Sequence, residues 1–404
     1  MTRKRREGLR IVALLENNPY PRDVRVRPHM EALAAEGHRA TVICPRDHGQ
    51  RWRETVNEVD VYRFPSLTVG SGKARYIWEF VWATVVMTVL ALWVWKRQGM
   101  DVLHIYNPPE SLFVAGLLPK LAGKTIVYDV RDIAPELFQA KFEDSSPVLN
   151  RTLLGLEYVM CHLADHVVVV NESYRRILLA RDHVPPARVS VVRQAPDLDQ
   201  VHPVEPDPDL RSRAGTIIGY MGSMAGQDGI DHLLEALRQL DQRFGHADWF
   251  CALIGPAEDQ QSLVALSAEL GLSDRTWFQE YLPMERWLPL LSAADVCVEP
   301  CPSNPINSIS TMNKIMDYMA LGKPVVAYDL PEHRFTAGEA ALYARPNDQV
   351  DFARQILRLI EDPELRSQLG AIGRERMEQL FAWPYQRQNL INIYETLARK
   401  NETA

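Results

Sequence analysis

The sequence predicts an α/β protein with two doubly wound parallel sheets, each in its own Rossmann-like domain. The chain has 404 residues, which is too many for one ordinary core. Short runs rich in Val and Ile alternate with longer helical stretches along its whole length, as in repeated strand–helix–strand units. These runs are continuously apolar rather than alternating, which is typical of strands buried on both faces.

The first domain is expected over residues 1–196. Its strand candidates include RIVALLE at the start of the chain and TIVYDV further on, and helical stretches lie between most of them. The predicted strands are 10–16, 40–45, 60–64, 101–107, 125–130, 166–171 and 189–194.

The helical segment 77–95, IWEFVWATVVMTVLALWVW, is unusual because Glu79 is its only charged residue. The 16 uncharged residues that end it are fewer than the roughly 20 that span a bilayer. A buried core helix explains one apolar face. A helix lying in the membrane interface also explains the four tryptophans and the basic flank of Lys96 and Arg97. A helix that spans the membrane is the third interpretation. Peripheral membrane contact through 77–97 is thus one of three interpretations of this segment.

The second domain is expected over residues 214–383, after a linker at 197–213 that is rich in proline and acidic residues. Two such domains are expected to face each other across a ligand-binding cleft. The predicted strands are 216–222, 248–255, 276–282, 295–300, 324–329 and 341–344, and the predicted helices are 229–243, 258–270, 284–293, 311–321, 348–361 and 363–380.

Composition narrows the class of protein. The five cysteines are scattered without metal-ligand spacing, which predicts free thiols in a reducing, cytoplasmic compartment. Residues 1–100 carry 17 Lys and Arg against 10 Asp and Glu, a net charge of +7, whereas the other 304 residues carry −14. The basic part predicts an anionic surface or acceptor as partner. A zinc finger, an RNA-binding signature and metal-ligand spacing are lacking, so neither nucleic acid nor a metal is expected.

The stretch STMNKIMDYMALGKPVVAYD at 310–329 predicts a helix that feeds a buried strand. Ser310 and Thr311 are good helix caps, and Lys314 and Asp317 share one face three residues apart. The edge of an open α/β sheet, where helix N-termini present their amides, is a ligand-binding place. The alternative is that Lys314 and Asp317 form only an ion pair on the surface.

This helix with its GKPVVA strand resembles the nucleotide-sugar site of retaining glycosyltransferases of family 4, which have the GT-B fold. NNPYPRDVRVRPHMEALAAEGHRATVICPR is similar to the family's acceptor loop, while HIYNPPESLFVAGLL and YDVRDIAPELFQAKF resemble its bacterial surface-polysaccharide branch. YMGSMAGQDGIDHLLEALRQL resembles the start of the donor domain. LFAWPYQRQNLINIYETL resembles the final helix, which implies that residues 384–404 cross back to the first domain.

The resemblance and the chemistry of a diphosphate leaving group predict the donor site. The turn amides and the helix N-terminus would hold the diphosphate, Asp317 the ribose, and the loop at 280–282 the nucleobase. The predicted donor-binding residues are Gly222, Ser223, Met224, Glu280, Tyr281, Leu282, Ser310, Thr311, Met312, Asn313, Lys314 and Asp317. Five positions depart from the family pattern. A basic pair and a first glutamate are replaced by Ser223, Asp228 and Ile309, Asp317 replaces the second glutamate, and Arg131 stands where a histidine is usual.

Acceptor and catalytic residues are expected after strands of the first domain. Arg22 or Arg25 would hold the phosphates of a lipid-linked acceptor, although a solvated helix start explains them as well. Asp132 or Glu136 would orient or deprotonate an acceptor hydroxyl. The candidates for acceptor binding are Asn18, Arg22, Arg25, Asn107, Pro108 and Glu136, and the catalytic candidates are Arg131, Asp132 and Arg193. Arg193 would reach the diphosphate or the sugar, or form a structural ion pair instead.

The predicted function is that of a retaining glycosyltransferase. It would move a sugar from a nucleotide donor, UDP-linked by preference, to a lipid-linked or saccharide acceptor in bacterial envelope glycan biosynthesis. The resemblance implies no metal and no cofactor, and a place in the cytoplasm or at the inner face of the plasma membrane. A sugar-nucleotide epimerase of the same architecture is one alternative. A non-catalytic binding protein is another, motivated by Ser223, Asp228 and Ile309.

Overall fold

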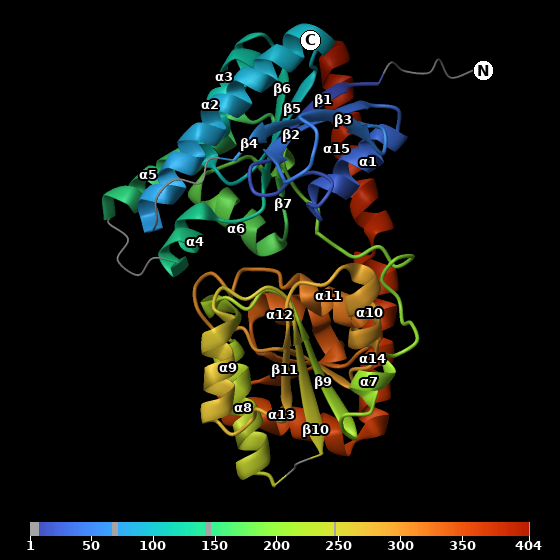
Figure 1. Ribbon diagram of the computed structural model, residues 1–404. Helices are drawn as coiled ribbons and strands as arrows, with labels where there is room; N and C mark the ends of the chain where they lie inside the picture. Colours follow the sequence, from blue (N-terminus) through green and yellow to red (C-terminus); the bar gives the residue numbers. More distant parts are fainter. Residues whose placement is uncertain (1–7, 67–71, 142–146, 246–247, 404) are drawn as a thin grey trace, which may run out of the picture. The chain divides into compact units, whose positions relative to one another are not determined.

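The computed structural model describes residues 8–66, 72–141, 147–245 and 248–403 (Figure 1). The chain divides into two compact units. The first contains Met1–Gln194 together with Gln386–Ala404, and the second contains Ala195–Tyr385. Each unit is built on one sheet, which confirms the predicted class of two parallel-sheet α/β domains.

The sheet of the first unit has eight strands in the order β3-β4-β2-β1-β5-β6-β7-β8. The four central strands are apolar and buried along almost their whole length, as their Val- and Ile-rich sequences predict. The strands are β1 (Arg10–Leu14), β2 (Arg39–Arg46), β3 (Arg53–Val56), β4 (Val59–Pro65), β5 (Val102–Tyr106), β6 (Thr125–Val130), β7 (His166–Val169) and β8 (Val189–Val191).

Strand β3 corrects the sequence prediction, which had no strand there and a fully parallel sheet. It pairs antiparallel with β4 through a two-residue turn at Asn57 and Glu58, whose φ angles are 48° and 63°. Such left-handed pairs match the twist of a tight hairpin. The strand lies at the sheet edge and its sequence, RETV, is too short and polar to signal a buried strand.

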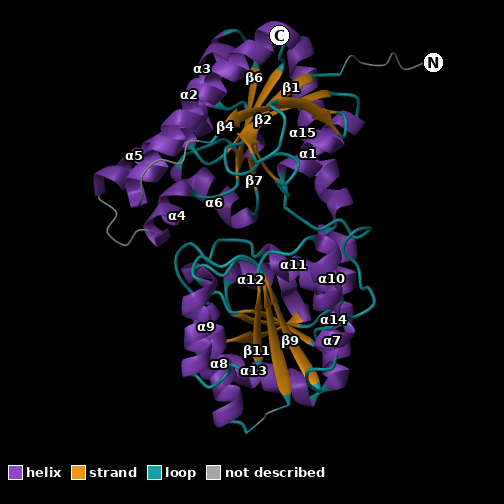
Figure 2. Ribbon diagram, viewed as in Figure 1, coloured by secondary structure: helices purple, strands orange, loops and turns teal. Residues whose placement is uncertain are grey.

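Helices cover both faces of the first sheet (Figure 2). From Gln386 onward the last helix belongs to this unit, where Leu390, Ile393 and Leu397 pack into the core. Its Tyr394 hydroxyl lies 2.7 Å from Nδ1 of His104. The helices are α1 (Val26–Ala35), α2 (Gly72–Gln98), α3 (Phe113–Leu121), α4 (Ala134–Lys141), α5 (Pro147–Leu163), α6 (Glu172–Arg181) and α15 (Trp383–Thr403), with short 3-10 turns at Glu110–Leu112 and Pro186–Arg188.

The sheet of the second unit is parallel throughout, in the order β11-β10-β9-β12-β13-β14. Two apolar clusters, one on each face, fill the space between strands and helices. The strands are β9 (Thr216–Met221), β10 (Trp249–Ile254), β11 (Thr276–Gln279), β12 (Val296–Glu299), β13 (Val325–Tyr328) and β14 (Ala341–Ala344).

The helices of the second unit differ from prediction in three places. A short helix, α7 (Pro208–Arg211), lies in the predicted linker, where Val201 and Leu210 are buried in the core. An unpredicted helix, α12 (Pro331–Ala337), follows β13, and a π-helical turn (Met377–Phe381) interrupts the predicted helix at 363–380. The others are α8 (Ile230–Gln242), α9 (Gln260–Glu269), α10 (Met284–Ser292), α11 (Asn313–Ala320), α13 (Gln349–Glu361) and α14 (Pro363–Arg376), with 3-10 turns at Gly226–Asp228 and Gly338–Ala340. All five cysteines are buried free thiols.

Candidate functional site

The edge of the second sheet contains a topological switch point between β9 and β12. From β9 the chain proceeds outward to β10 and β11, and from β12 it proceeds to β13 and β14 on the other side. Ligands of open α/β sheets bind outside the carboxyl ends of the strands at such a point. The turn that begins at Gly222 follows β9, and Glu299 ends β12, so both lie at this position.

Two glycines allow the turns after β9 and β10 to touch. Gly222 has a φ of 152° and Gly255 a φ of 144°, a region that side chains rarely adopt. The Gly222 N–H donates to the carbonyl of Ile254, and a Cβ on Gly255 would lie 1.9 Å from the Gly222 oxygen. A Cβ on Gly222 would lie 2.8 Å from Cε of Lys314. The predicted turn and the predicted lysine therefore lie together.

Lys314 is buried beneath this turn and has three oxygen neighbours. Its Nζ lies 2.9 Å from the Tyr220 hydroxyl, 3.1 Å from Oε2 of Glu299 and 3.5 Å from Oδ1 of Asp228. Burial opposes its charge, but the Glu299 carboxylate and the other oxygens hold the pKa of Lys314 well above its ordinary value. Lys314 is therefore a buried and paired ammonium, and the alternative of a surface ion pair with Asp317 is wrong.

Helix α11 begins later than predicted, and its cap is different. Met312 is the N-cap and supplies no side-chain hydrogen bond to the first turn. Ser310 donates instead to the carbonyl of Ile306 at 2.8 Å, and the Thr311 hydroxyl lies 3.3 Å from Glu332. Because no side chain caps the first turn, the backbone N–H groups of Asn313 and Lys314 can donate hydrogen bonds to an anion.

Asp317 lies one turn further along α11 and is half-buried. Burial raises the pKa of its carboxyl group to about 7. Among the contacts described for this part of the chain, none is a hydrogen bond or ion pair to that carboxylate. A half-buried acid of this kind can accept or share a proton with a ligand hydroxyl.

The remaining predicted donor residues lie along the same sheet edge. Met224 is buried, with its N–H bonded to the carbonyl of Pro256 at 2.8 Å, and the Ser223 carbonyl accepts from the Tyr220 hydroxyl. Glu280 and Tyr281 are exposed directly after β11. Leu282 packs against the core of the unit, so the loop at 280–282 presents backbone and an aromatic ring at the edge.

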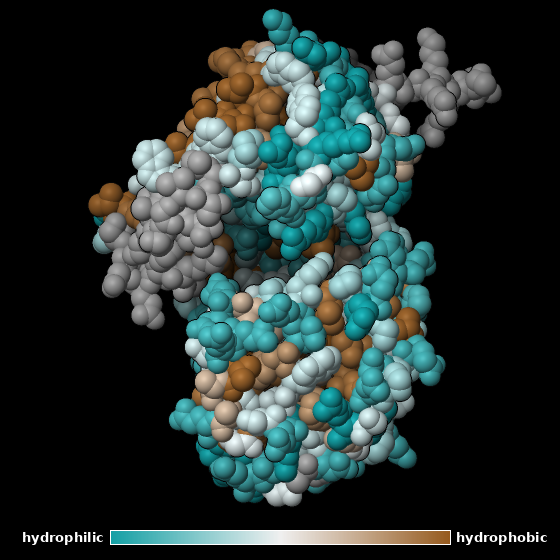
Figure 3. All heavy atoms as spheres, in the orientation of Figure 1, coloured by the Kyte–Doolittle hydropathy of each residue, from teal (hydrophilic) through white to brown (hydrophobic). Residues whose placement is uncertain are grey.

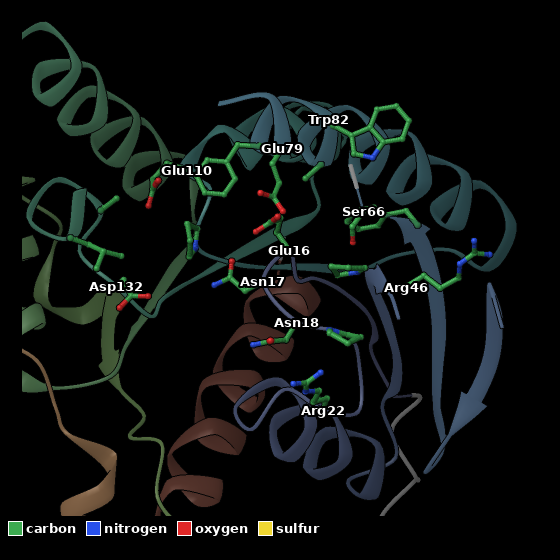
Figure 4. Close-up of a pocket in the computed structure, with 18 of the residues that line it drawn as sticks. Glu16, Asn17, Asn18, Arg22, Arg46, Ser66, Glu79, Trp82, Glu110 and Asp132 are labelled. Atoms are coloured by element: carbon green, nitrogen blue, oxygen red, sulfur yellow. The ribbon is translucent and has the colours of Figure 1, made fainter. Parts of the chain in front are cut away.

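A pocket of about 550 Å³ lies in the first unit, at the carboxyl ends of its central strands (Figure 4). The loop after β1, the end of β2, helix α2 and the loops after β5 and β6 line it. Four residues predicted for the acceptor or for catalysis are brought together there, namely Asn18, Arg22, Pro108 and Asp132.

Carboxylates dominate the polar lining of this pocket. Glu16 and Glu79 point toward each other in Figure 4. Burial, helped by the charge of Glu79, raises the pKa of Glu16 to about 7. Burial also raises the pKa of Glu110. Carboxyl groups beside the aromatic rings of Phe80 and Trp82 suit a polyhydroxyl ligand, which offers hydroxyls to the acids and C–H faces to the rings.

Sequence reasoning missed Glu16 and Glu79 as site residues. Two signals could have found them. Glu16 is the last residue of the first predicted strand, where the functional edge of the sheet lies, and Glu79 is the only charge in the apolar segment 77–95. A lone carboxylate in such a segment needs a polar environment.

Arg25 corrects an acceptor-site prediction. Its guanidinium is about 1% exposed, and it donates to Asp129 at 2.9 and 3.0 Å and to the Val192 carbonyl at 2.9 Å. Burial opposes ionisation of Asp129, but Arg25 holds the pKa of that carboxyl well below its usual range. Arg25 is therefore a structural residue and does not reach an acceptor phosphate.

Glu136 and Asn107 also have structural partners. Glu136 forms an ion pair with Arg181 at 2.6 Å and does not line the pocket. Asn107 is buried and donates to Glu110 at 3.0 Å and to the Asp132 carbonyl at 2.6 Å. Its side-chain oxygen accepts from the N–H of Arg131. Asn107 thus positions the two pocket acids, whereas an acceptor role for Glu136, which is paired with Arg181 outside the pocket lining, stays a prediction.

The two catalytic arginines have different surroundings. Arg131 pairs with Asp23 at 2.8 Å, and this charge outweighs burial to hold the pKa of Asp23 below its ordinary value. Arg193 is buried and its N–H donates to Gln386 at 2.9 Å. A catalytic role for either stays a prediction, while Asp132 lies in the pocket wall. Within the described ranges, no group of three His, Cys, Asp or Glu side chains could hold a metal ion.

Comparisons with known proteins define the class. Residues 23–195 match the family model described as "Glycosyl transferase 4-like domain", and residues 215–362 match the one described as "Glycosyl transferases group 1". The α-maltose-1-phosphate synthase of Mycolicibacterium smegmatis is 27% identical over 60% of this chain and 66% of its own length. The first three curated relatives are matched over 66%, 51% and 46% of their lengths.

Solved structures agree on the fold. Sucrose-phosphate synthase from Thermosynechococcus elongatus aligns with a TM-score of 0.76 at 21% identity, over 97% of this chain and 100% of that one. Anabaena HepE in complex with UDP and glucose aligns with a TM-score of 0.73 at 17% identity, over 97% and 100%. The chain is therefore a glycosyltransferase of the GT-B fold, which joins a glycosyl transferase 4-like domain to a group 1 domain.

Proposed function

We propose that the protein is a retaining glycosyltransferase that uses a UDP-linked sugar as donor. The observation that carries this proposal is the junction of the Gly222 turn, Lys314 and the uncapped start of α11 at the switch point of the second sheet. A glycine turn, free amides and a buried ammonium are the groups that a diphosphate needs.

The donor would lie along the edge of the second sheet. Its diphosphate would meet the amides of Asn313 and Lys314, and Lys314 would exchange a carboxylate neighbour for a phosphate oxygen. Asp317, one turn on, would accept from a ribose hydroxyl. The loop at 280–282 would contact the nucleobase through its backbone, as the family resemblance implies.

The acceptor would enter the pocket of the first unit. An acceptor hydroxyl oxygen forms the new bond to the anomeric carbon while the bond from that carbon to the phosphate oxygen breaks. The nucleoside diphosphate leaves, and the hydroxyl proton passes to its phosphate oxygen on the same face, which retains configuration. Asp132, with Asn107 holding its backbone, would orient the hydroxyl.

The wider setting follows from two supports. The sequence resembles the surface-polysaccharide branch of family 4, and a relative that is 29% identical over 41% of this chain is named a lipopolysaccharide core biosynthesis glycosyltransferase. We therefore infer a lipid-linked or saccharide acceptor in bacterial envelope glycan synthesis, at the cytoplasmic side of the membrane. No metal or other cofactor is required by this scheme, since amides and Lys314 stabilise the leaving group.

The test is incubation of the protein with a panel of nucleotide sugars, with lipid-linked and saccharide acceptors supplied separately. Release of UDP with a new α-linked glycoside from an α-linked donor supports the proposal, because configuration is retained. An isomerised donor would instead indicate an epimerase. Saturable donor binding without any product would indicate a non-catalytic binding protein. The acidic neighbours of Lys314 are the observation that favours this alternative.

A further inference from the structure

Helix α2 exposes apolar side chains on the face turned away from its core. Ala83, Met87 and Val94 are fully or almost fully buried. On the opposite side, Trp78 is 61% and Val89 60% exposed, with Val81 and Val85 between them. A surface helix of a globular protein normally presents polar residues there. The window Trp78–Gln98 is long and apolar enough to cross a membrane, yet only 28% of it is buried.

Neighbouring helices extend this surface. Helix α3 packs between α2 and α5, and its Leu118 and Leu121 are 55% and 85% exposed. Val148 and Tyr158 of α5 are also exposed. Eleven of the eighteen large hydrophobic side chains that are exposed within the described ranges lie on α2, α3 and α5. We call the surface that these eleven side chains form the apolar face. Figure 3 shows hydrophobic side chains gathered over α2 and α3.

The exposed charges on the helices of the apolar face are mainly basic. Its three helices contain two carboxylates, and neither belongs to the face, because Glu79 lines the pocket and Glu157 is buried against Arg181. Basic side chains are exposed at its borders, with Lys96 and Arg97 at the end of α2 and Arg151 on α5. This combination of apolar surface, tryptophan and basic rim complements the surface of an anionic bilayer.

We propose that the apolar face docks the protein onto an anionic membrane surface without crossing it. The inner side of α2 packs into the core of the first unit. The helix would therefore lie in the membrane–water interface and would not span the bilayer. Trp78 and Tyr158 would sit at headgroup level, and the basic rim would meet anionic lipids.

Docking by this face would also place the pocket beside the lipid. Glu79, Phe80, Trp82 and Ala83, all on α2, line the pocket. The same helix therefore bears the membrane-facing residues on one side and pocket residues on another. This inference rests on the proposed function and makes it more specific. The acceptor would be a lipid-linked saccharide whose head group enters the pocket while its lipid stays in the bilayer.

The first test is cosedimentation of the full chain with phosphatidylcholine vesicles, with and without phosphatidylglycerol. We expect binding to the anionic vesicles that weakens as salt rises. The double variant Val85→Asp with Leu118→Asp should bind about tenfold or more weakly, because two charges enter the contact. Val264→Asp is the matched control, since Val264 is a similarly exposed valine on α9 of the second unit. Melting temperatures of both variants establish that they fold.

The second test separates charge from apolar contact and from catalysis. Lys96→Glu with Arg97→Glu should remove the preference for phosphatidylglycerol. UDP binding and transfer to a soluble saccharide acceptor should be unchanged in all these variants, so loss of docking and failure of the proposed transferase activity are distinguishable. Wild-type protein that ignores both vesicle types overturns the inference. A dimer in solution that Val85→Asp dissociates also overturns it, because a second copy would then cover the face.

Discussion

Arg25 of the first unit and Lys314 of the second are both buried near the carboxyl edge of a sheet, and they are held in different ways. Arg25 forms a bidentate ion pair with Asp129 and donates a further hydrogen bond to the Val192 carbonyl. Lys314 shares a single ammonium among Glu299, Asp228 and a tyrosine hydroxyl under a glycine turn. A guanidinium fork fixed on one carboxylate is part of the scaffold, whereas a point charge among several oxygens can exchange one of them for a ligand.

The largest expected effect is on the scaffold cation. Arg25→Ala leaves the buried Asp129 carboxylate without its ion-pair partner, so the free energy of unfolding should fall by about 3–5 kcal/mol. Denaturant titration measures it. Arg39→Ala, which removes an exposed pair with Asp60, is the control and should cost less than about 1 kcal/mol. Equal small losses for both variants would show that Arg25 is not part of the scaffold.

Replacement of the other cation should affect ligand binding. Lys314→Ala should weaken UDP binding by about 1.5–3 kcal/mol, because a charged hydrogen bond to phosphate is lost. Isothermal titration of folded protein gives the affinity, and Lys124→Ala in the first unit serves as control. If Lys314→Ala binds UDP as the wild type does, Lys314 is not in the donor site.

Glu16, which lies beside Glu79 in the pocket of the first unit, should make the stability of that unit depend on pH. The folded state raises the pKa of Glu16 from 4.5 to about 7, so it keeps a proton that the unfolded chain loses. Stability should therefore fall as pH rises from about 4.5 through about 7, by about 3 kcal/mol. Glu16→Gln should remove this loss, whereas Glu31→Gln should not. Parallel pH profiles of wild type and Glu16→Gln would refute the raised pKa of Glu16.

The smallest effect concerns the neighbour of Lys314. Asp228→Asn removes one of the carboxylates that compete with phosphate, while its side-chain oxygen can still accept from the Ala225 N–H. UDP affinity should rise by about 1 kcal/mol, the scale of one hydrogen bond. Weaker binding by this variant would mean that Asp228 supports the donor site instead of restraining it.

Much of the fold was predictable because its signals are local. Thirteen of the predicted strands correspond to β1, β2 and β4–β14, since buried parallel strands are continuous runs of apolar residues. Strand β3 was missed because an exposed edge strand has no such run. The start of α11 was misplaced because Ser310 and Thr311 look like caps, although their hydroxyls lie near Ile306 and Glu332 instead.

The candidate site was only partly predictable. Gly222 and Lys314 were found because glycine turns and helix starts after strands are recognisable in sequence. Arg25 and Glu136 were assigned to the acceptor because they too follow strands, but their partners Asp129 and Arg181 lie far along the chain. Position after a strand brings a residue to the functional edge, and it does not say whether the side chain is already paired.

The sequence by itself determined the two α/β units, most of their strands and the turn and helix that meet at the switch point. Periodicity, glycine and helix-forming residues act over a few neighbours, so these features are readable from the chain. Only the tertiary structure decided the partners of each charge: Glu299 and Asp228 for Lys314, and Glu79 beside Glu16. Those pairs depend on strand order and on which helix face turns inward, and both are set by packing across the whole unit.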